Sequence, residues 1–354
     1  MVTRWRPSTL QRTHSAVNPL VNAWLQFAAC AAVIAVAGAN LSRYGDVIAE
    51  KSGVSRSWVG LVLLATVTSL PELVTGVAAV AIAAVPNIAA GDVLGSCVFN
   101  LAILVVVDYL HRNEPVYRRA RQGHILSAGF GVVMIGFVGL NLLLGGRIDA
   151  LSLGHVGIYT PAIVLLYAVA IRAVFHYERE ELRAHVHEET LRYPHMTLRQ
   201  AATRYAVAAL CILAAGTWLP FAGAELARVM GWHGTFVGTL FVAGATSLPE
   251  LAVTVVALRI GAVDMAIANL LGSNLFNIVV LAVDDLFYLP GPLLSHVSPM
   301  HAMSAITACV MSGVVIVALL YRPGSRVLRT VGWASVCLVV LYLLNAYVLY
   351  LHGE

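Results

Sequence analysis

TSLPEL stands at residues 68–73 and returns unchanged at residues 246–251. A second shared phrase follows each copy, GSCVFN at residues 95–100 and GSNLFN at residues 272–277. Each copy places a carboxylate, a proline and several hydroxyl groups inside long apolar runs. An ionisable side chain at membrane depth is costly, so its default interpretation is functional. The duplication therefore predicts one ion site to which two matching halves of the chain each contribute a carboxylate.

The composition assigns the chain to the membrane. Its 354 residues are 59% hydrophobic and only 11% charged, whereas a soluble domain is nearer one-quarter charged. The expected surroundings are therefore membrane lipid. The net charge of +4 is small and gives no reason to expect nucleic acid as a partner. Five single cysteines without ligand spacing predict neither a disulfide framework nor a cysteine metal site.

The apolar runs predict an all-α membrane protein with ten transmembrane helices. About twenty apolar residues cross a bilayer as a helix, which satisfies its own backbone hydrogen bonds. We place the spans near residues 21–41, 57–84, 87–110, 123–145, 153–175, 203–228, 234–260, 262–288, 300–320 and 328–351. Five spans precede a polar segment and five follow it. An odd number in each half turns the second half upside down, so we expect two inverted five-helix repeats, a plan common in secondary transporters.

This organisation divides the chain into four parts. They are an N-terminal segment (1–20), a first transmembrane repeat (21–175), a cytoplasmic connecting loop (176–202) and a second transmembrane repeat (203–351). The loop mixes arginine, glutamate and histidine without clear ligand spacing, so a solvated helical connector is favoured over a regulatory or metal-sensing element. Arginines ahead of the first apolar run resemble a signal peptide, but the length of that run favours a retained helix, and cleavage stays open.

The basic residues predict the orientation. Most of the 22 Lys and Arg residues lie in loops on the side of the 176–202 connection. Loops rich in these residues stay in the cytoplasm. We therefore expect a multi-pass protein of the cell (inner) membrane with both termini outside, and the sequence predicts no oligomeric state.

Each TSLPEL phrase can break a helix and gather oxygen ligands around one carboxylate. Pro71 lacks the N–H that would bond the Val67 carbonyl, so the helix is expected to break at the residue before it. Where the helix persists, Thr68 and Ser69 share a face with Glu72, because they precede it by four and three residues. Hard oxygens of this kind suit Na⁺, Ca²⁺ and Mg²⁺ rather than Zn²⁺. Two such glutamates would balance the charge of one Ca²⁺.

The second phrase of each copy adds neutral oxygen ligands. Ser96 and Asn100 are four residues apart, as are Ser273 and Asn277, so each pair presents a hydroxyl and an amide on one helix face. Neutral oxygens of this kind suit weaker coordination of Na⁺. The glycine that opens each phrase would allow neighbouring helices to approach closely. Packing alone remains an alternative for the two serines, whereas a simple kink does not explain the repeated glutamate.

The repeated TSLPE and GSxxFN phrases resemble those of the calcium/cation antiporter superfamily, and most closely its sodium/calcium exchanger branch as found in prokaryotes. The resemblance is clear over two alpha repeats, residues 53–108 and 231–285. It implies a ten-helix fold of inverted repeats in which the second, third, seventh and eighth helices surround the ion site. It also implies that the first and sixth helices, 21–41 and 203–228, slide past a static core.

The resemblance also implies a role for each motif residue. Glu72 and Glu250 would be the calcium carboxylates. The further oxygen ligands for Ca²⁺ or Na⁺ would be Thr68, Thr246, Ser69, Ser247, Ser96, Ser273, Asn100, Asn277 and the backbone carbonyls of Ala65 and Ala243. Many relatives place an aspartate at one of the two asparagine positions, so a third carboxylate is expected to be missing here, and Cys97 stands where asparagine is usual. Asp108 and Asp285 form a further matched pair, for which the lining of an aqueous mouth and a plain helix-end role stay equally open.

The sequence therefore predicts a secondary active transporter that exchanges Ca²⁺ for Na⁺ across a membrane by alternating access. The transported ions are Ca²⁺ and Na⁺, and no cofactor is expected. A Ca²⁺/H⁺ exchanger with Glu72 and Glu250 as proton carriers remains an alternative, and a cation channel is a second one. An enzyme is not expected, because the chain has neither an HExxH nor a GxSxG motif.

Overall fold

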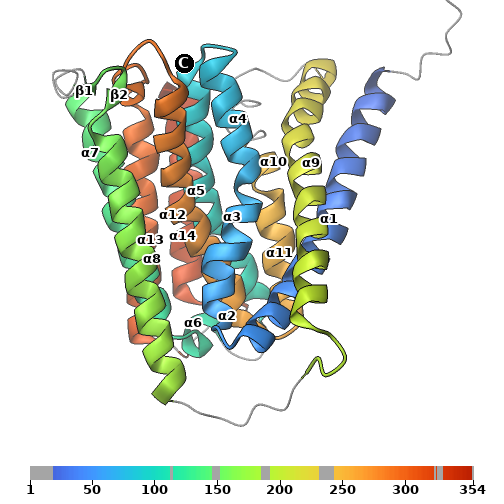
Figure 1. The fold of residues 1–354 in the computed structure, drawn as a ribbon. Helices are drawn as coiled ribbons and strands as arrows, with labels where there is room; N and C mark the ends of the chain where they lie inside the picture. Colours follow the sequence, from blue (N-terminus) through green and yellow to red (C-terminus); the bar gives the residue numbers. More distant parts are fainter. Residues whose placement is uncertain are drawn as a thin grey trace, which may run out of the picture.

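The computed structural model describes residues 19–111, 115–145, 152–184, 192–230, 243–322, 324 and 330–352. Long helices run side by side in one bundle (Figure 1). They are α1 (Pro19–Ser52), α5 (Pro86–Leu110), α7 (Gly123–Leu144), α8 (Tyr159–Ala184), α9 (Leu198–Met230), α12 (Val263–Phe287), α13 (His301–Tyr321) and α14 (Trp333–His352). The shorter elements are α2 (Arg56–Trp58), the π-helix η1 (Val59–Leu64), α3 (Ala65–Thr68), α4 (Leu70–Ala81), α6 (Val116–Arg119), β1 (Ser152–Leu153), β2 (Val156–Gly157), α10 (Ala243–Thr246), α11 (Leu248–Arg259) and the 3₁₀ helix η4 (Leu293–Ser295).

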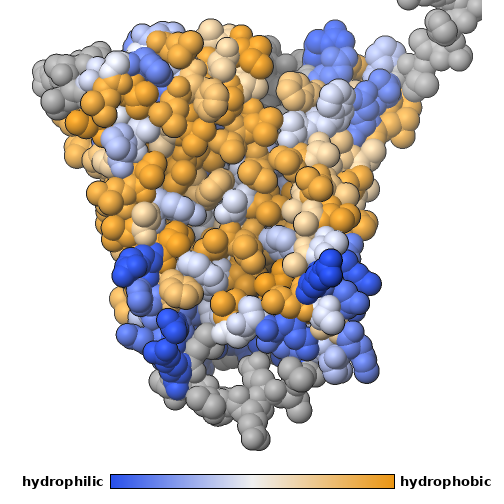
Figure 2. All heavy atoms as spheres, viewed as in Figure 1, coloured by the Kyte–Doolittle hydropathy of each residue, from blue (hydrophilic) through white to orange (hydrophobic). Residues whose placement is uncertain are grey.

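Nine stretches of the described residues are long and apolar enough to cross a bilayer. They coincide with the predicted spans except for the one at 234–260, of which residues 234–242 lie outside the described part of the chain; its remainder is α10 followed by α11. Apolar side chains cover the middle of the face shown in Figure 2, and hydrophilic ones gather toward its two ends. The predicted all-α membrane fold is confirmed.

The two halves of the chain repeat the same order of elements. A four-residue helix, a break and a twelve-residue helix form α3–α4 and again α10–α11. Each pair is followed by a helix of 25 residues, α5 or α12. Helix α12 begins beside the segment that follows α5, as the 2.9 Å hydrogen bond from the Arg121 N–H to Asp264 shows. The two long helices therefore run in opposite directions, as inverted repeats require.

Helices α1 and α9 stand together at one side of the bundle and lie across the broken helices (Figure 1). The Ser42 hydroxyl of α1 donates a hydrogen bond to the Val253 carbonyl of α11 at 2.8 Å. Gly216 of α9 lies against Pro71 and Pro249, because a Cβ atom at this glycine would approach their rings to 2.5 and 3.7 Å. Helix α9 therefore contacts the prolines of both TSLPEL phrases at once.

The segment predicted as a cytoplasmic loop (176–202) is helical at both ends. Helix α8 continues to Ala184, and α9 begins at Leu198. Just before α9, the Tyr193 hydroxyl donates a hydrogen bond to Asp46 of α1 at 3.0 Å. Burial, together with the negative charge of Asp46, raises the pKa of Tyr193. This phenol therefore stays protonated at neutral pH and can keep donating to the carboxylate.

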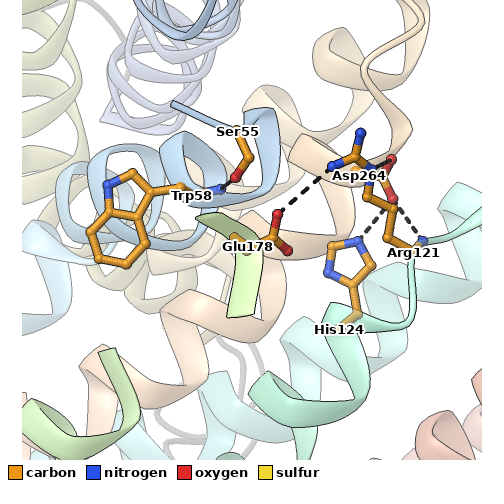
Figure 3. A network of polar contacts seen from close by, with 6 residues as sticks. All are labelled: Ser55, Trp58, Arg121, His124, Glu178 and Asp264. Atoms are coloured by element: carbon orange, nitrogen blue, oxygen red, sulfur yellow. Dashed lines mark hydrogen bonds and ion pairs between the residues drawn. The ribbon is translucent and has the colours of Figure 1, made fainter. Parts of the chain in front are cut away.

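Glu178 departs from the predicted solvated connector, because it is buried in a polar network at the start of α12 (Figure 3). It forms an ion pair with Arg121 at 3.8 Å, and Arg121 pairs with Asp264 at 3.6 Å. The His124 ring nitrogen Nε2 lies 3.0 Å from the same Asp264 carboxylate. These contacts fix the beginning of α12 against α7 and α8.

Helix α12 also packs closely against η1, which precedes the first TSLPEL phrase. Gly272 makes this approach possible, because a Cβ atom there would overlap the backbone of Leu61. Small residues at helix contacts in membranes allow backbones to come this near. The contact matters for the site, since Gly272 directly precedes Ser273.

Gly272→Ala is expected to destabilise the protein by about 1–3 kcal/mol, because the added methyl group forces α12 and η1 apart. The midpoint of thermal unfolding in detergent measures the effect. Gly313→Ala on α13 is the matched control, since a Cβ atom there would meet nothing within 4 Å. Equal midpoints for the two variants would contradict the close contact.

Candidate functional site

The chain interrupts its helix once in each TSLPEL phrase, at the serine. Ser69, between α3 and α4, and Ser247, between α10 and α11, both have ψ angles of 6°, outside the helical range. The break comes one residue before the predicted position, since Leu70 already begins α4. Pro71 then lies in the first turn of α4, where its missing N–H removes no helical hydrogen bond. The glutamate of each phrase thus enters the first turn of a new helix, whose positive dipole end favours a carboxylate.

Glu72 and Glu250 lie fully buried inside the bundle. The Ser69 hydroxyl donates a hydrogen bond to Glu250 Oε1 at 3.0 Å, and the Ser273 hydroxyl approaches the same atom at 3.4 Å. The Ser96 hydroxyl approaches Glu72 Oε1 at 3.4 Å. The other oxygen of each carboxylate, Oε2, has no hydrogen-bond partner within the described residues. Ser69, three residues before Glu72, thus links the first TSLPEL phrase directly to the glutamate of the second.

The hydroxyl groups around the glutamates join the two repeats. Ser247 donates a hydrogen bond to Ser96 at 3.2 Å. The Thr68 and Ser273 hydroxyl oxygens are 3.4 Å apart. Each pair unites a residue of one copy with a residue of the other. Both carboxylates, the serines of all four phrases and Thr68 are thus brought together in one buried place.

Thr246 contacts a residue outside the repeated phrases. Its hydroxyl donates a hydrogen bond to Asp92 Oδ1 at 3.1 Å. Asp92 is buried on α5, one turn before Ser96. The expectation of a missing third carboxylate is therefore incomplete, because one is present at another position. The sequence signal for Asp92 was an aspartate inside an apolar run. The comparison of the two copies did not reveal it, because the matching residue of the second copy is Asn269.

Asn100 and Asn277 are buried one turn beyond the site serines. Asn100 donates a hydrogen bond to the Asn274 side-chain oxygen at 3.1 Å, and Asn274 donates to the Cys97 backbone carbonyl at 3.1 Å. These bonds connect α5 with α12 across the two repeats. The Asn100 amide nitrogen thus serves helix packing, while its oxygen has no partner among the described residues.

The two alanines of the predicted site begin the short helices before the breaks. The Ala65 carbonyl accepts hydrogen bonds from the Ser69 N–H at 3.1 Å and from the Thr68 hydroxyl at 3.3 Å. Its oxygen therefore lies within one turn of the site hydroxyls. Ala243 is the first residue of α10 and holds the equivalent place in the second copy.

Asp108 and Asp285 anchor loops at the helix ends. Asp108 accepts hydrogen bonds from the Val116 N–H at 3.0 Å, from the Gly332 N–H at 2.7 Å and from the Ser335 hydroxyl at 2.6 Å. Asp285 holds an equivalent set at the other end of the bundle. Both side chains are 0% exposed. Of the two open interpretations, the structure favours the helix-end role over the lining of an aqueous mouth.

Comparison with known proteins identifies the family. The family model described as "Sodium/calcium exchanger protein" matches residues 22–175 and 202–351. The chain is 24% identical over 249 residues to "Inner membrane protein YrbG" of Escherichia coli (strain K12), which covers 70% of this chain and 74% of that protein. It is 48% identical over 63 residues, 18% of each chain, to "Sodium/calcium exchanger MaX1" of Methanosarcina acetivorans.

A solved structure of the sodium-calcium exchanger NCX_Mj, soaked with 100 mM Na⁺ and 10 mM Sr²⁺, aligns with a TM-score of 0.69 at 20% identity. The alignment covers 93% of this chain and 98% of that chain. At this identity the likeness shows the fold alone. The family match spans both repeats and most of the chain. The protein therefore belongs to the sodium/calcium exchanger family.

Proposed function

We propose that the protein is a secondary active transporter that exchanges Ca²⁺ for Na⁺ across the membrane by alternating access. One observation carries the proposal. Glu72 of one repeat and Glu250 of the other lie buried together, each with a carboxylate oxygen that has no hydrogen-bond partner within the described residues. Buried carboxylates in this state are costly unless a cation or a proton neutralises them. Their combined double negative charge matches one Ca²⁺.

The groups around the glutamates supply further hard ligands. Ca²⁺ takes six to eight oxygens at about 2.3–2.6 Å. We assign coordination of Ca²⁺ or Na⁺ to Glu72, Glu250, Thr68, Thr246, Ser69, Ser247, Ser96, Ser273, Asn100, Asn277 and the carbonyls of Ala65 and Ala243. The hydroxyls and amides are neutral and suit Na⁺, whereas the carboxylates suit the divalent ion. Because the two ions draw on shared oxygens, binding of one displaces the other, which is the physical basis of exchange.

Helices α1 and α9 are the elements whose movement would alternate access. They contact each other extensively and lie over the broken helices. Gly216 of α9 touches both prolines next to the glutamates. A shift of α9 along the bundle therefore changes what covers the two halves of the site. MaX1 and NCX_Mj are both named as sodium/calcium exchangers, and this likeness supports the same pair of ions.

Calcium flux in liposomes tests the proposal. The protein is reconstituted, and uptake of radioactive calcium is followed with a Na⁺, K⁺ or proton gradient imposed one at a time. Uptake driven by internal Na⁺ alone is expected. Uptake that follows the proton gradient and ignores Na⁺ would establish the Ca²⁺/H⁺ alternative. Rates far above those of carriers, without an obligatory counter-ion, would establish a channel.

We also infer that both termini face the outside of the cell membrane. The basic residues of the 176–202 connection support this orientation, because basic loops remain in the cytoplasm. A cysteine introduced at Arg199 should resist an impermeant thiol reagent in intact cells and react in inverted vesicles, after the exposed Cys211 has been replaced by serine. Labelling in intact cells would reverse the orientation.

A further inference from the structure

Two buried carboxylates lie beyond the glutamate pair. Asp92 is on α5, and Asp284 is on α12 beside Asp285. One oxygen of Asp92 and both oxygens of Asp284 have no hydrogen-bond partner among the described residues, although the Asp284 side chain is 0% exposed. In the described part of the chain, no Lys, Arg or His forms an ion pair with Asp92 or Asp284. Carboxylates buried in this way need a cation or a proton to neutralise them.

Helix α4 leaves room for the Asp284 carboxylate. Gly76 lies on α4 one turn beyond Glu72, and a Cβ atom at Gly76 would overlap the Asp284 carboxylate. The carboxylate therefore rests directly on the helix that carries Glu72. Asp92 lies on α5 one turn before Ser96 and accepts a hydrogen bond from the Thr246 hydroxyl at 3.1 Å. Asp284, against Gly76, and Asp92, bonded to Thr246, therefore each lie beside a residue near the glutamate pair, and these two acids are called the acidic row below.

The row occupies one end of the bundle. Asp285, next to Asp284, accepts a hydrogen bond from the Gly157 N–H of β2 at 2.9 Å. Asp284 therefore lies near the end of the bundle that carries β1 and β2 (Figure 1). In the orientation proposed above, this end faces outside.

The inverted second copy has no acidic counterpart to this row. The residues that match Asp92, Asp284 and Gly76 are Asn269, Val107 and Thr254. Asn269 donates a hydrogen bond to Thr254 at 3.1 Å, so a neutral pair fills the equivalent place. Since the two copies are inverted, these positions are acidic on one side of the glutamates, whereas the matching positions on the other side are neutral.

We propose that Asp92 and Asp284 form a second cation-binding site, on the β1–β2 side only. This site binds a hard cation such as Ca²⁺ before the ion reaches Glu72 and Glu250. The inference rests on the proposed function, because it concerns entry of the same ion into the same site. Negatively charged groups beside the path of an ion raise the local concentration of cations. The apparent affinity for Ca²⁺ is therefore higher at the β1–β2 face than at the opposite face.

Membrane vesicles of both orientations test this asymmetry. The protein inserts in one direction in the cell, so right-side-out and inverted vesicles expose opposite faces to added Ca²⁺. The KM for calcium uptake is measured in each, with Na⁺ loaded inside. Asp92→Asn and Asp284→Asn are each expected to raise KM about tenfold at the β1–β2 face and to leave it within about twofold at the other.

The chain offers a matched variant for the opposite face. Asp92→Asn introduces the residue that already occupies the matching position 269, so this variant is expected to fold, which size-exclusion chromatography checks. Asn269→Asp is expected to lower KM at the opposite face instead. An equal change of KM at both faces, or no change at either face, would overturn the proposal of a second cation-binding site. The proposed function fails by a different result, the absence of Na⁺-driven Ca²⁺ uptake by the unaltered protein.

Discussion

Glu72→Gln is expected to reduce Na⁺-driven Ca²⁺ uptake by more than about 100-fold. The substitution keeps the shape of the side chain but removes one of the two negative charges that face the ion. A divalent cation then retains an uncompensated charge in a buried site, which costs several kcal/mol, and about 1.4 kcal/mol corresponds to a factor of ten. The initial rate of radioactive calcium uptake into liposomes measures the effect.

Glu250→Gln is expected to have the same effect from the other repeat. The two losses should not add, because either one alone leaves the site with too little charge to hold Ca²⁺, and groups that act as a unit are non-additive. Glu178→Gln is the matched control. Glu178 is also a buried glutamate, but it pairs with Arg121 at the start of α12, outside the ion site. Uptake within about threefold of the unaltered protein in either site variant would remove that glutamate from the site.

The duplicated phrases explain why so much of the fold was predictable. A carboxylate and a proline inside apolar runs indicate a membrane protein, and their repetition with five spans on each side of a polar segment requires inversion. Spacing within one helix also predicted that Thr68 would lie near Glu72, and the family resemblance implied that Ser96 belongs to the same site. The boundaries of α1 and α9 were less predictable, since both helices extend past their apolar windows into polar ends.

Contacts between the two copies could not be predicted from spacing. Ser69 precedes Glu72 by three residues, yet its hydroxyl donates to Glu250 of the other repeat. This partner depends on the break at Ser69 and on how α3 packs against α11, the helix that carries Glu250. Asp92 was missed for a different reason. Residues that are identical in both copies stand out when the copies are aligned. Asp92 does not stand out, because the matching residue of the second copy is the amide Asn269.

The sequence left two roles open for Asp285, the lining of an aqueous mouth and a helix-end role. Its hydrogen bonds favour the helix-end role. Its carboxylate is fully buried at the end of α12. The donors are the Gly157 N–H at 2.9 Å, the Leu293 N–H at 2.7 Å, the Tyr159 hydroxyl at 2.5 Å and the Thr160 hydroxyl at 2.5 Å. One side chain therefore ties the end of α12 to β2, to the start of α8 and to η4. Removing it leaves two backbone N–H groups without their acceptor.

Asp285→Ala is accordingly expected to destabilise the protein by about 3–5 kcal/mol, because each buried donor left without a partner costs about 1–3 kcal/mol. The midpoint of thermal unfolding in detergent measures the loss, with Leu286→Ala as the control, since that neighbouring side chain is 50% exposed and is expected to shift the midpoint little. Asp285→Asn keeps one acceptor oxygen and should fall between the two. In vesicles, the KM for Ca²⁺ of the folded Asp285→Asn protein should stay unchanged. A tenfold rise in KM at an unchanged midpoint would instead place Asp285 at the aqueous mouth, because only a side chain that meets the ion alters affinity without altering stability.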